Sequence, residues 1–133
     1  MACWLLKSEP DSYGWDDLVR NGRTEWDGVR NAAAAGHLRG MTPGDSALFY
    51  HSGKARAAVG IATITRAARP DGDDGRWVSV EIAPDRPLPR PITLAAMKAE
   101  AKLAALPILR QSRLSVSPVG EAEWDVLMAM AGL

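Results

Sequence analysis

The chain has 133 residues, enough for one domain with a substantial hydrophobic core. Hydrophobic residues make up 47% and charged residues 24%, which is ordinary for a soluble globular protein, and the formal net charge is zero. A neutral chain excludes a global field that would draw the protein to nucleic acid or to acidic membranes, so any polyanion contact must come from a local patch.

The residues near the N-terminus indicate the cellular compartment in which the protein is expected. Cys3 is the only cysteine, so no disulfide forms within the chain and a reducing compartment is expected. Lys7 and Glu9 interrupt the start of the chain before a signal-peptide core can form. No apolar run approaches the roughly 18 residues of a membrane helix. We expect a cytoplasmic protein, or a nuclear one if its source is eukaryotic, with no membrane contact.

The first elements are short. An apolar run at 3–7 predicts a buried first strand. Residues 15–19 predict a helix with Trp15, Leu18 and Val19 on one face, closed by an Asn-Gly pair.

A tight turn follows, in which Trp26 precedes Asp27 and Gly28. Asp bonds its own backbone and Gly accepts positive φ, so the Trp ring stands at the lip of this turn. Residues 31–41 then predict a second helix with Ala34, Leu38 and Met41 facing inward, and an apolar run predicts a strand at 47–50.

Two further strands are predicted at 58–65 and 77–82, joined by the acidic loop 70–75 as a long hairpin. Gly60 within the first of them indicates a bulge or a close backbone approach. The proline-rich stretch 84–91 predicts an extended surface crossover.

The last third predicts a short helix after the N-cap Thr93, a strand at 114–117 and an amphipathic C-terminal helix. The inward face of that helix is formed by Trp124, Leu127, Met128 and Ala131. Short strands with helices inserted between them predict a single α+β domain around a small, mostly antiparallel sheet, and pairing of the end strands would give a closed or nearly closed barrel.

Polar clusters follow the ends of these elements, where a small barrel forms its pocket. The candidate site residues are Lys7, Ser8, Glu9, Trp26, Arg30, Asn31, Tyr50, His51, Ser52, Ser112 and Arg113. An aromatic plate beside amide and hydroxyl groups suits a planar, hydrogen-bonding ligand such as a nucleobase.

Each candidate also has a plainer interpretation. Trp26 alone reads as a core aromatic, and Lys7 with Glu9 as an ion pair at a strand end. His51 is either a pocket donor or a capped loop histidine. Arg110 is either a phosphate contact or a solvated surface charge.

Four motifs resemble those of EVE domains, in the order seen in that family. They are WLLKSEP at 4–10, TEWDGVRN at 24–31, FYHS at 49–52 and RQSRLSV at 110–116. The resemblance covers essentially the whole chain. It implies a PUA-like fold, which is a mixed, mostly antiparallel β-barrel flanked by short helices and similar to YTH domains.

The resemblance also implies non-catalytic binding of a modified nucleobase, with 5-methylcytosine-type bases in DNA as the leading candidates. Trp26 would stack on the flipped base, Ser8, Asn31 and Ser112 would read its edge, and Arg30, Arg110 and Arg113 would hold phosphates. No cofactor or metal is expected, and a separate effector protein is one possible partner. The chain departs from the family at Ala32-Ala33-Ala34-Ala35, where many members carry an aromatic and a longer polar side chain, which predicts a wider pocket if these positions line it.

Two alternatives stay open. One is a small hydrolase or RNA-processing enzyme of the ASCH type, which would use Lys7, Glu9 and His51 and would place Lys7 and Glu9 side by side, with a perturbed lysine pKa. The other is a small-molecule or nucleoside sensor without a basic flank. The sequence decides neither DNA against RNA nor the oligomeric state.

Overall fold

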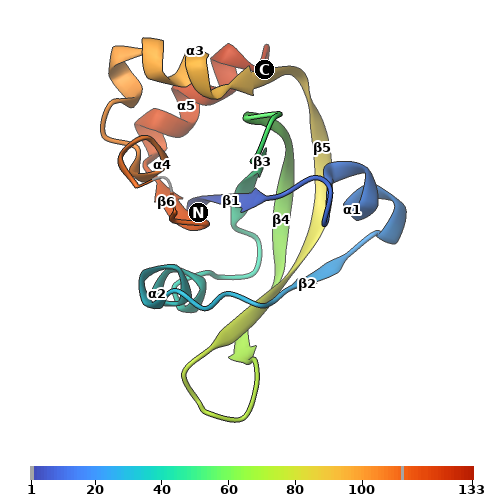
Figure 1. Cartoon of the computed structure of the whole chain (residues 1–133). Coiled ribbons are helices and arrows are strands. Elements are labelled where there is room, and N and C mark those ends of the chain that lie inside the picture. The colour runs from blue at the N-terminus through green and yellow to red at the C-terminus, as the bar shows by residue number, and fades with distance from the viewer. Residues whose placement is uncertain (1, 112) are drawn as a thin grey trace.

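The computed structural model describes residues 2–111 and 113–133, and its centre is a six-stranded sheet in the order β2-β5-β4-β3-β1-β6 (Figure 1). The strands are β1 (Cys3–Ser8), β2 (Thr24–Trp26), β3 (Ser46–His51), β4 (Ala57–Pro70), β5 (Val78–Thr93) and β6 (Val116–Val119). The helices are α1 (Trp15–Asn21), α2 (Ala32–Arg39), α3 (Leu94–Ala99), the 3-10 turn η1 (Ala101–Leu103), α4 (Pro107–Arg110) and α5 (Glu121–Met130).

The sheet is mixed and mostly antiparallel, as the sequence predicted. Strands β1 and β3 run parallel, whereas β1–β6, β2–β5, β3–β4 and β4–β5 are antiparallel. The prediction of a closed barrel is wrong, because the sheet stays open with β2 and β6 as its two edges. These edge strands have only three and four residues, so they offer few backbone groups for closing the sheet, and short edges also resist pairing with other chains.

Helices cover the two faces of the sheet separately. On one face, α1 and α2 bury Leu18 and Leu38 in a core cluster that also contains Leu6 and Phe49. On the other face, side chains of α3, α4 and α5 form a second cluster that contains Leu5, Leu48 and Tyr50. Figure 1 shows α3, α4 and α5 gathered at one end of the molecule, away from α2. Because side chains alternate along a strand, neighbouring residues of β1 and β3 enter different cores.

The proline-rich stretch 84–91 is extended, but it is part of β5 and not a separate surface crossover. Pro84 and Pro87 lie opposite Ala62 and Gly60 of β4, at register shifts where a ladder hydrogen bond is not needed, and this is where strands tolerate proline. Leu88 is buried and ties the stretch to the second core.

The predicted inward face of the first helix is right for Trp15 and Leu18 and wrong for Val19, which is 53% exposed. Gly22, with φ of 79°, ends this helix in the left-handed conformation that the Asn-Gly pair predicted. The last strand starts two residues later than expected, and α4 was not predicted. Within residues 2–111 and 113–133, no helix combines the length and apolar character needed to cross a membrane.

Gly60 combines both features that the sequence indicated for it. The β3–β4 register shifts between Phe49 and Tyr50, directly opposite Gly60, so the strand is irregular there. The Trp15 ring packs on the glycine so closely that an added Cβ would lie 2.6 Å from its carbons. This contact fixes α1 over the sheet, beside the cavity described next.

Candidate functional site

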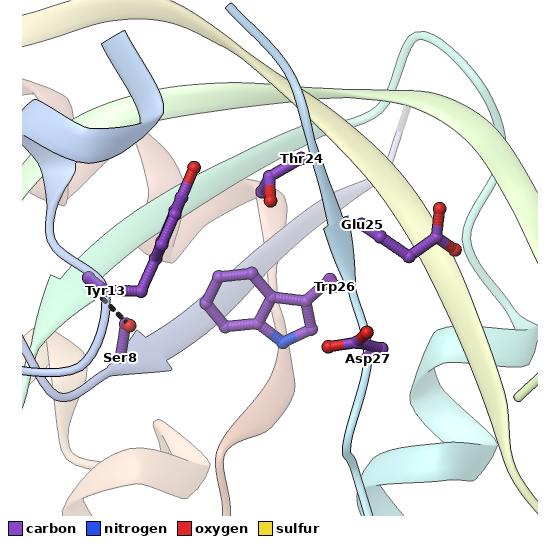
Figure 2. A pocket seen from close by; sticks show the side chains of 6 residues that line it. All are labelled: Ser8, Tyr13, Thr24, Glu25, Trp26 and Asp27. Carbon is purple, nitrogen blue, oxygen red and sulfur yellow. Dashed lines mark hydrogen bonds between the residues drawn. The ribbon is translucent and has the colours of Figure 1, made fainter. Parts of the chain in front are cut away.

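A cavity of about 350 Å³ opens between the end of β1, the loop before α1, and β2. Its lining residues, which define the aromatic cavity, are Ser8, Tyr13, Thr24, Glu25, Trp26 and Asp27. Figure 2 shows the rings of Tyr13 and Trp26 on the same side of β2, with Ser8 beside Tyr13. The cavity therefore offers two aromatic surfaces together with hydroxyl and carboxylate groups.

Trp26 belongs to the cavity and to the core at once. Only 9% of its surface is exposed, and its ring meets Phe49 edge to face at 5.8 Å between centroids. The next residues form the expected turn, in which Gly28 has φ of 74°. Phe49 also meets the Trp15 ring edge to face, so the position of Trp26 is set by a rigid aromatic cluster.

The polar groups of the aromatic cavity are held by local hydrogen bonds. The Ser8 hydroxyl donates to the Tyr13 carbonyl, which leaves the Ser8 oxygen able to accept from a ligand. Nδ2 of Asn21 donates to the Tyr13 hydroxyl at 2.9 Å, which fixes the phenol ring. Asp27 is exposed at the rim.

The Glu25 carboxylate points away from Trp26 (Figure 2). Arg66 donates to both of its oxygens, at 2.8 and 2.6 Å, and the Ser79 hydroxyl donates to one of them. Chiefly because of the Arg66 hydrogen bonds, the pKa of Glu25 falls to about 2. The network anchors the edge strand β2 to β4 and β5, and so it fixes one wall of the cavity.

His51 lies on the same face of the sheet, at the end of β3. Its Nε2 accepts from the backbone N–H of Trp15 at 3.0 Å, and its ring meets Phe49 edge to face. Burial lowers the pKa of the imidazole, which matches a neutral ring whose Nε2 lone pair is in use. His51 thus holds the start of α1.

Arg30 is tied to the β4–β5 loop. Its guanidinium donates to Asp71 Oδ2 at 3.0 Å and lies 5.6 Å from the centre of the Trp77 ring. The same Asp71 oxygen accepts from the Gly28 N–H at 2.9 Å, and these contacts, with the backbone one first, lower the pKa of Asp71. The Asp71 carboxylate therefore binds two donors, the Arg30 guanidinium and the Gly28 N–H, that are also suited to binding a phosphate.

A second hollow of about 330 Å³ lies further along the same chain segment. This arginine hollow is lined by Asn31, Ala33, Arg110, Gln111, Arg113 and Leu114. Asn31 Oδ1 accepts from the Ala34 N–H and so caps α2. Ser112 lies outside the described residues.

The alanine run does not line the aromatic cavity. Ala34 and Ala35 are fully buried in the protein, and Ala33 lines the arginine hollow. The second aromatic surface of the cavity comes instead from Tyr13, which sequence reasoning missed. The signal in the sequence was an aromatic residue directly before Gly14, the N-cap of α1. In the structure, a turn holds Tyr13 in place, because its N–H donates to the Glu9 carbonyl.

The other predicted residues face elsewhere. Lys7, Tyr50 and Ser52 line a hollow with the residues of α3, which cover the opposite face of the sheet from Trp26. Glu9 lines a further hollow with Lys54. Burial lowers the pKa of Lys7, but Lys7 and Glu9 line different hollows. Among the described residues, no three His, Cys, Asp or Glu side chains are grouped for a metal ion.

Comparisons of the sequence and of the structure with known proteins agree on one family. The EVE domain family model matches residues 2–130. The NMR structure of Rpa0253 from Rhodopseudomonas palustris is 46% identical with a TM-score of 0.94, and the match covers 99% of this chain and 94% of that one. Mouse thymocyte nuclear protein 1 is 30% identical over 163 residues, covering 96% of this chain and 72% of the mouse protein.

The crystal structure of human THYN1 protein in complex with 5-methylcytosine-containing DNA is also similar, with 28% identity and a TM-score of 0.91. That match covers 100% of this chain and 99% of the human chain. A mutant ZmASCH protein from Zymomonas mobilis is only 12% identical, with a TM-score of 0.60, so that likeness concerns the fold alone.

Proposed function

Because the chain belongs to the EVE domain family, we propose that it binds a modified nucleobase of the 5-methylcytosine type in DNA, flipped out of the helix into the aromatic cavity. The observation that carries the proposal is the pair of rings, Tyr13 and Trp26, that face one cavity beside hydroxyl and carboxylate groups. Its volume of about 350 Å³ lies in the range of small-ligand sites.

The cavity supplies what an extruded base loses. Stacking on an aromatic side chain returns about 1–3 kcal/mol per base, which helps to offset the cost of leaving the duplex. Trp26 is suited to this because the Phe49 contact already fixes its ring, so little side-chain entropy remains to be lost on binding.

The polar groups favour a base that carries an amino group. An acidic side chain accepts a hydrogen bond from the N4 amino group of cytosine, and Asp27 is the exposed acid at the rim. The Ser8 oxygen is a second acceptor. A methyl group adds only about 1–3 kcal/mol of discrimination, so the preference for the methylated base is modest.

The arginine hollow supports contacts to flanking phosphates. Arg110 and Arg113 line it, and Asn31 lies four residues beyond Asp27 on the same segment. Backbone contacts of this kind fix the position of a nucleic acid and make its affinity depend on salt.

The test is fluorescence anisotropy with labelled single- and double-stranded oligonucleotides that contain one cytosine, 5-methylcytosine, 5-hydroxymethylcytosine, adenine or N6-methyladenine. We compare wild type with Tyr13→Ala and Asp27→Asn, because Trp26→Ala would also damage the core. Asp125→Asn, an exposed acid on α5, is the matched control. Tightest binding to a modified cytosine, weakened about tenfold by either variant and unchanged in the control, supports the proposal. Equal, salt-sensitive binding to every oligonucleotide, unaffected by both variants, contradicts it.

A further inference from the structure

A hollow of about 380 Å³ lies on the other face of β1 and β3 from the aromatic cavity, and its lining is cationic. This cationic hollow is lined by Lys7, Tyr50, Ser52, Gly53, Arg56, Leu94 and Lys98. The described lining residues comprise three cations, two hydroxyl groups and no acid. Arg56, Leu94 and Lys98 also line an adjoining hollow of about 260 Å³, so the two depressions share these three residues.

The inner wall of the cationic hollow is rigid. Lys7 and Tyr50 are neighbours in the parallel β1–β3 register. Tyr50 is 2% exposed, and burial raises the pKa of its phenol, so at neutral pH the hydroxyl keeps its proton and can donate. Lys7 is half-buried, and this burial lowers the pKa of its ammonium group.

The outer wall is positioned by Arg56. Its φ is 43°, an uncommon conformation for a residue with a side chain, and it is held by two hydrogen bonds. The Arg56 carbonyl accepts from the Leu94 N–H at 2.8 Å, and its Nε donates to the Gly53 carbonyl at 3.2 Å. These bonds connect the β3–β4 loop to the start of α3, and Lys98 stands on the last turn of that helix.

We propose that the cationic hollow is a second binding site, specific for a phosphate group, and that it works independently of base binding. An ionised phosphate group carries strong hydrogen-bond acceptor oxygens, and the hollow is lined by donors from β1, β3, the β3–β4 loop and α3. Arg56 and Lys98 bring two exposed positive charges to one depression, and both charges attract an anion that enters it. The neighbouring acid, Glu9, packs against Gly53 and lines a separate hollow with Lys54.

The phosphate group has two possible sources, a free nucleotide or a nucleic-acid backbone. At constant ionic strength, we would follow backbone amide signals by NMR during titration with inorganic phosphate, deoxycytidine 5′-monophosphate, deoxycytidine and an abasic tetranucleotide. Saturable shifts at 50–56 and 94–98 with the phosphates, and none there with the nucleoside, are expected. Stronger binding of the abasic tetranucleotide than of the monophosphate identifies the backbone as the source, and the reverse order identifies a free nucleotide.

Variants separate this site from the others. Arg56→Gln and Lys98→Gln are exposed substitutions, and each should weaken phosphate binding about tenfold through the loss of a charge-assisted hydrogen bond. Lys102→Gln, an exposed cation outside the hollow, is the matched control, and Tyr13→Ala should leave phosphate binding unchanged. The proposal is overturned if no saturable shift occurs at these amides, if phosphate shifts only 110–114, or if Lys102→Gln weakens binding as much as Lys98→Gln does.

Discussion

Nε2 of His51 accepts a hydrogen bond from the backbone N–H of Trp15 at 3.0 Å, and this bond joins the end of β3 to the first residue of α1. The first N–H groups of a helix have no partner within it, so the imidazole satisfies one of them. Only a neutral ring with an unprotonated Nε2 can do this.

Stability should therefore fall on mild acidification. Burial lowers the pKa of His51 below its ordinary value of 6.5, with Asp16 and Glu9 acting in the opposite direction. A base with a lowered folded-state pKa contributes stability that is complete above the unfolded pKa and is lost as the pH falls below about 6.5. Urea unfolding between pH 8 and 5.5 should show a decreasing midpoint.

The same titration on variants checks the assignment. His51→Gln should flatten the pH dependence, whereas His37→Gln, which alters the other histidine, should retain it. An unchanged slope in His51→Gln would rule out this hydrogen bond as the cause.

Gly60→Ala should destabilise the fold by about 1–3 kcal/mol, because the new methyl group would lie 2.6 Å from carbons of the Trp15 ring. Gly36→Ala is the contrasting variant, since nothing lies within 4 Å of a Cβ there and alanine favours a helix by about 0.5–1 kcal/mol. Thermal unfolding of both variants measures the effects. Equal stability of the Gly60 variant and wild type would mean that Trp15 can move without cost.

Glu25→Gln should lower stability at pH 7 by about 1–2 kcal/mol, a value reduced for solvent screening, because Arg66 loses its paired carboxylate. The pKa of Glu25 is lowered from 4.5 to about 2, so its contribution is complete above pH 4.5 and is lost as the pH falls through 2. The difference between variant and wild type in denaturant unfolding should shrink over that range.

Glu81→Gln is the control for this network. Glu81 lies opposite Glu25 in the β2–β5 register, but its ion pair with Arg23 is long, at 3.6 Å, and the Arg23 side chain is exposed. Its loss should cost less than about 1 kcal/mol. A cost equal to that of Glu25→Gln would argue against a special role for the Arg66 pair.

Asp71→Asn should increase the affinity for DNA by about two- to fivefold at low salt, given the proposed function. The variant removes the carboxylate that competes with phosphate for Arg30 and for the Gly28 N–H. The gain should disappear as salt rises, since it depends on exposed charges. Anisotropy titrations at several salt concentrations measure it, with Asp74→Asn in the same loop as the control. A loss of affinity at low salt would show that Asp71 orients Arg30 productively instead.

Local chemistry predicted much of the fold. The Asn-Gly pair ends α1 at Gly22, Thr93 accepts from the Ala96 N–H as the N-cap of α3, and Gly60 lies at both a register shift and a close contact. Each of these depends on a few consecutive residues. The open edges of the sheet and the pairing of 84–91 within β5 depend on distant partners, and the sequence predicted them wrongly.

The candidate site shows the same division. The sequence by itself determined that polar and aromatic residues gather at the ends of β1, β2 and β3. Only the tertiary structure decided how they divide: Ser8 lines a cavity with Tyr13 and Trp26, while its neighbour Lys7 lines the hollow on the other face with Tyr50 and Arg56. The physical reason is that a strand sends successive side chains to opposite faces, and only the packing of α1 and α3 on those faces determines which residues share a cavity.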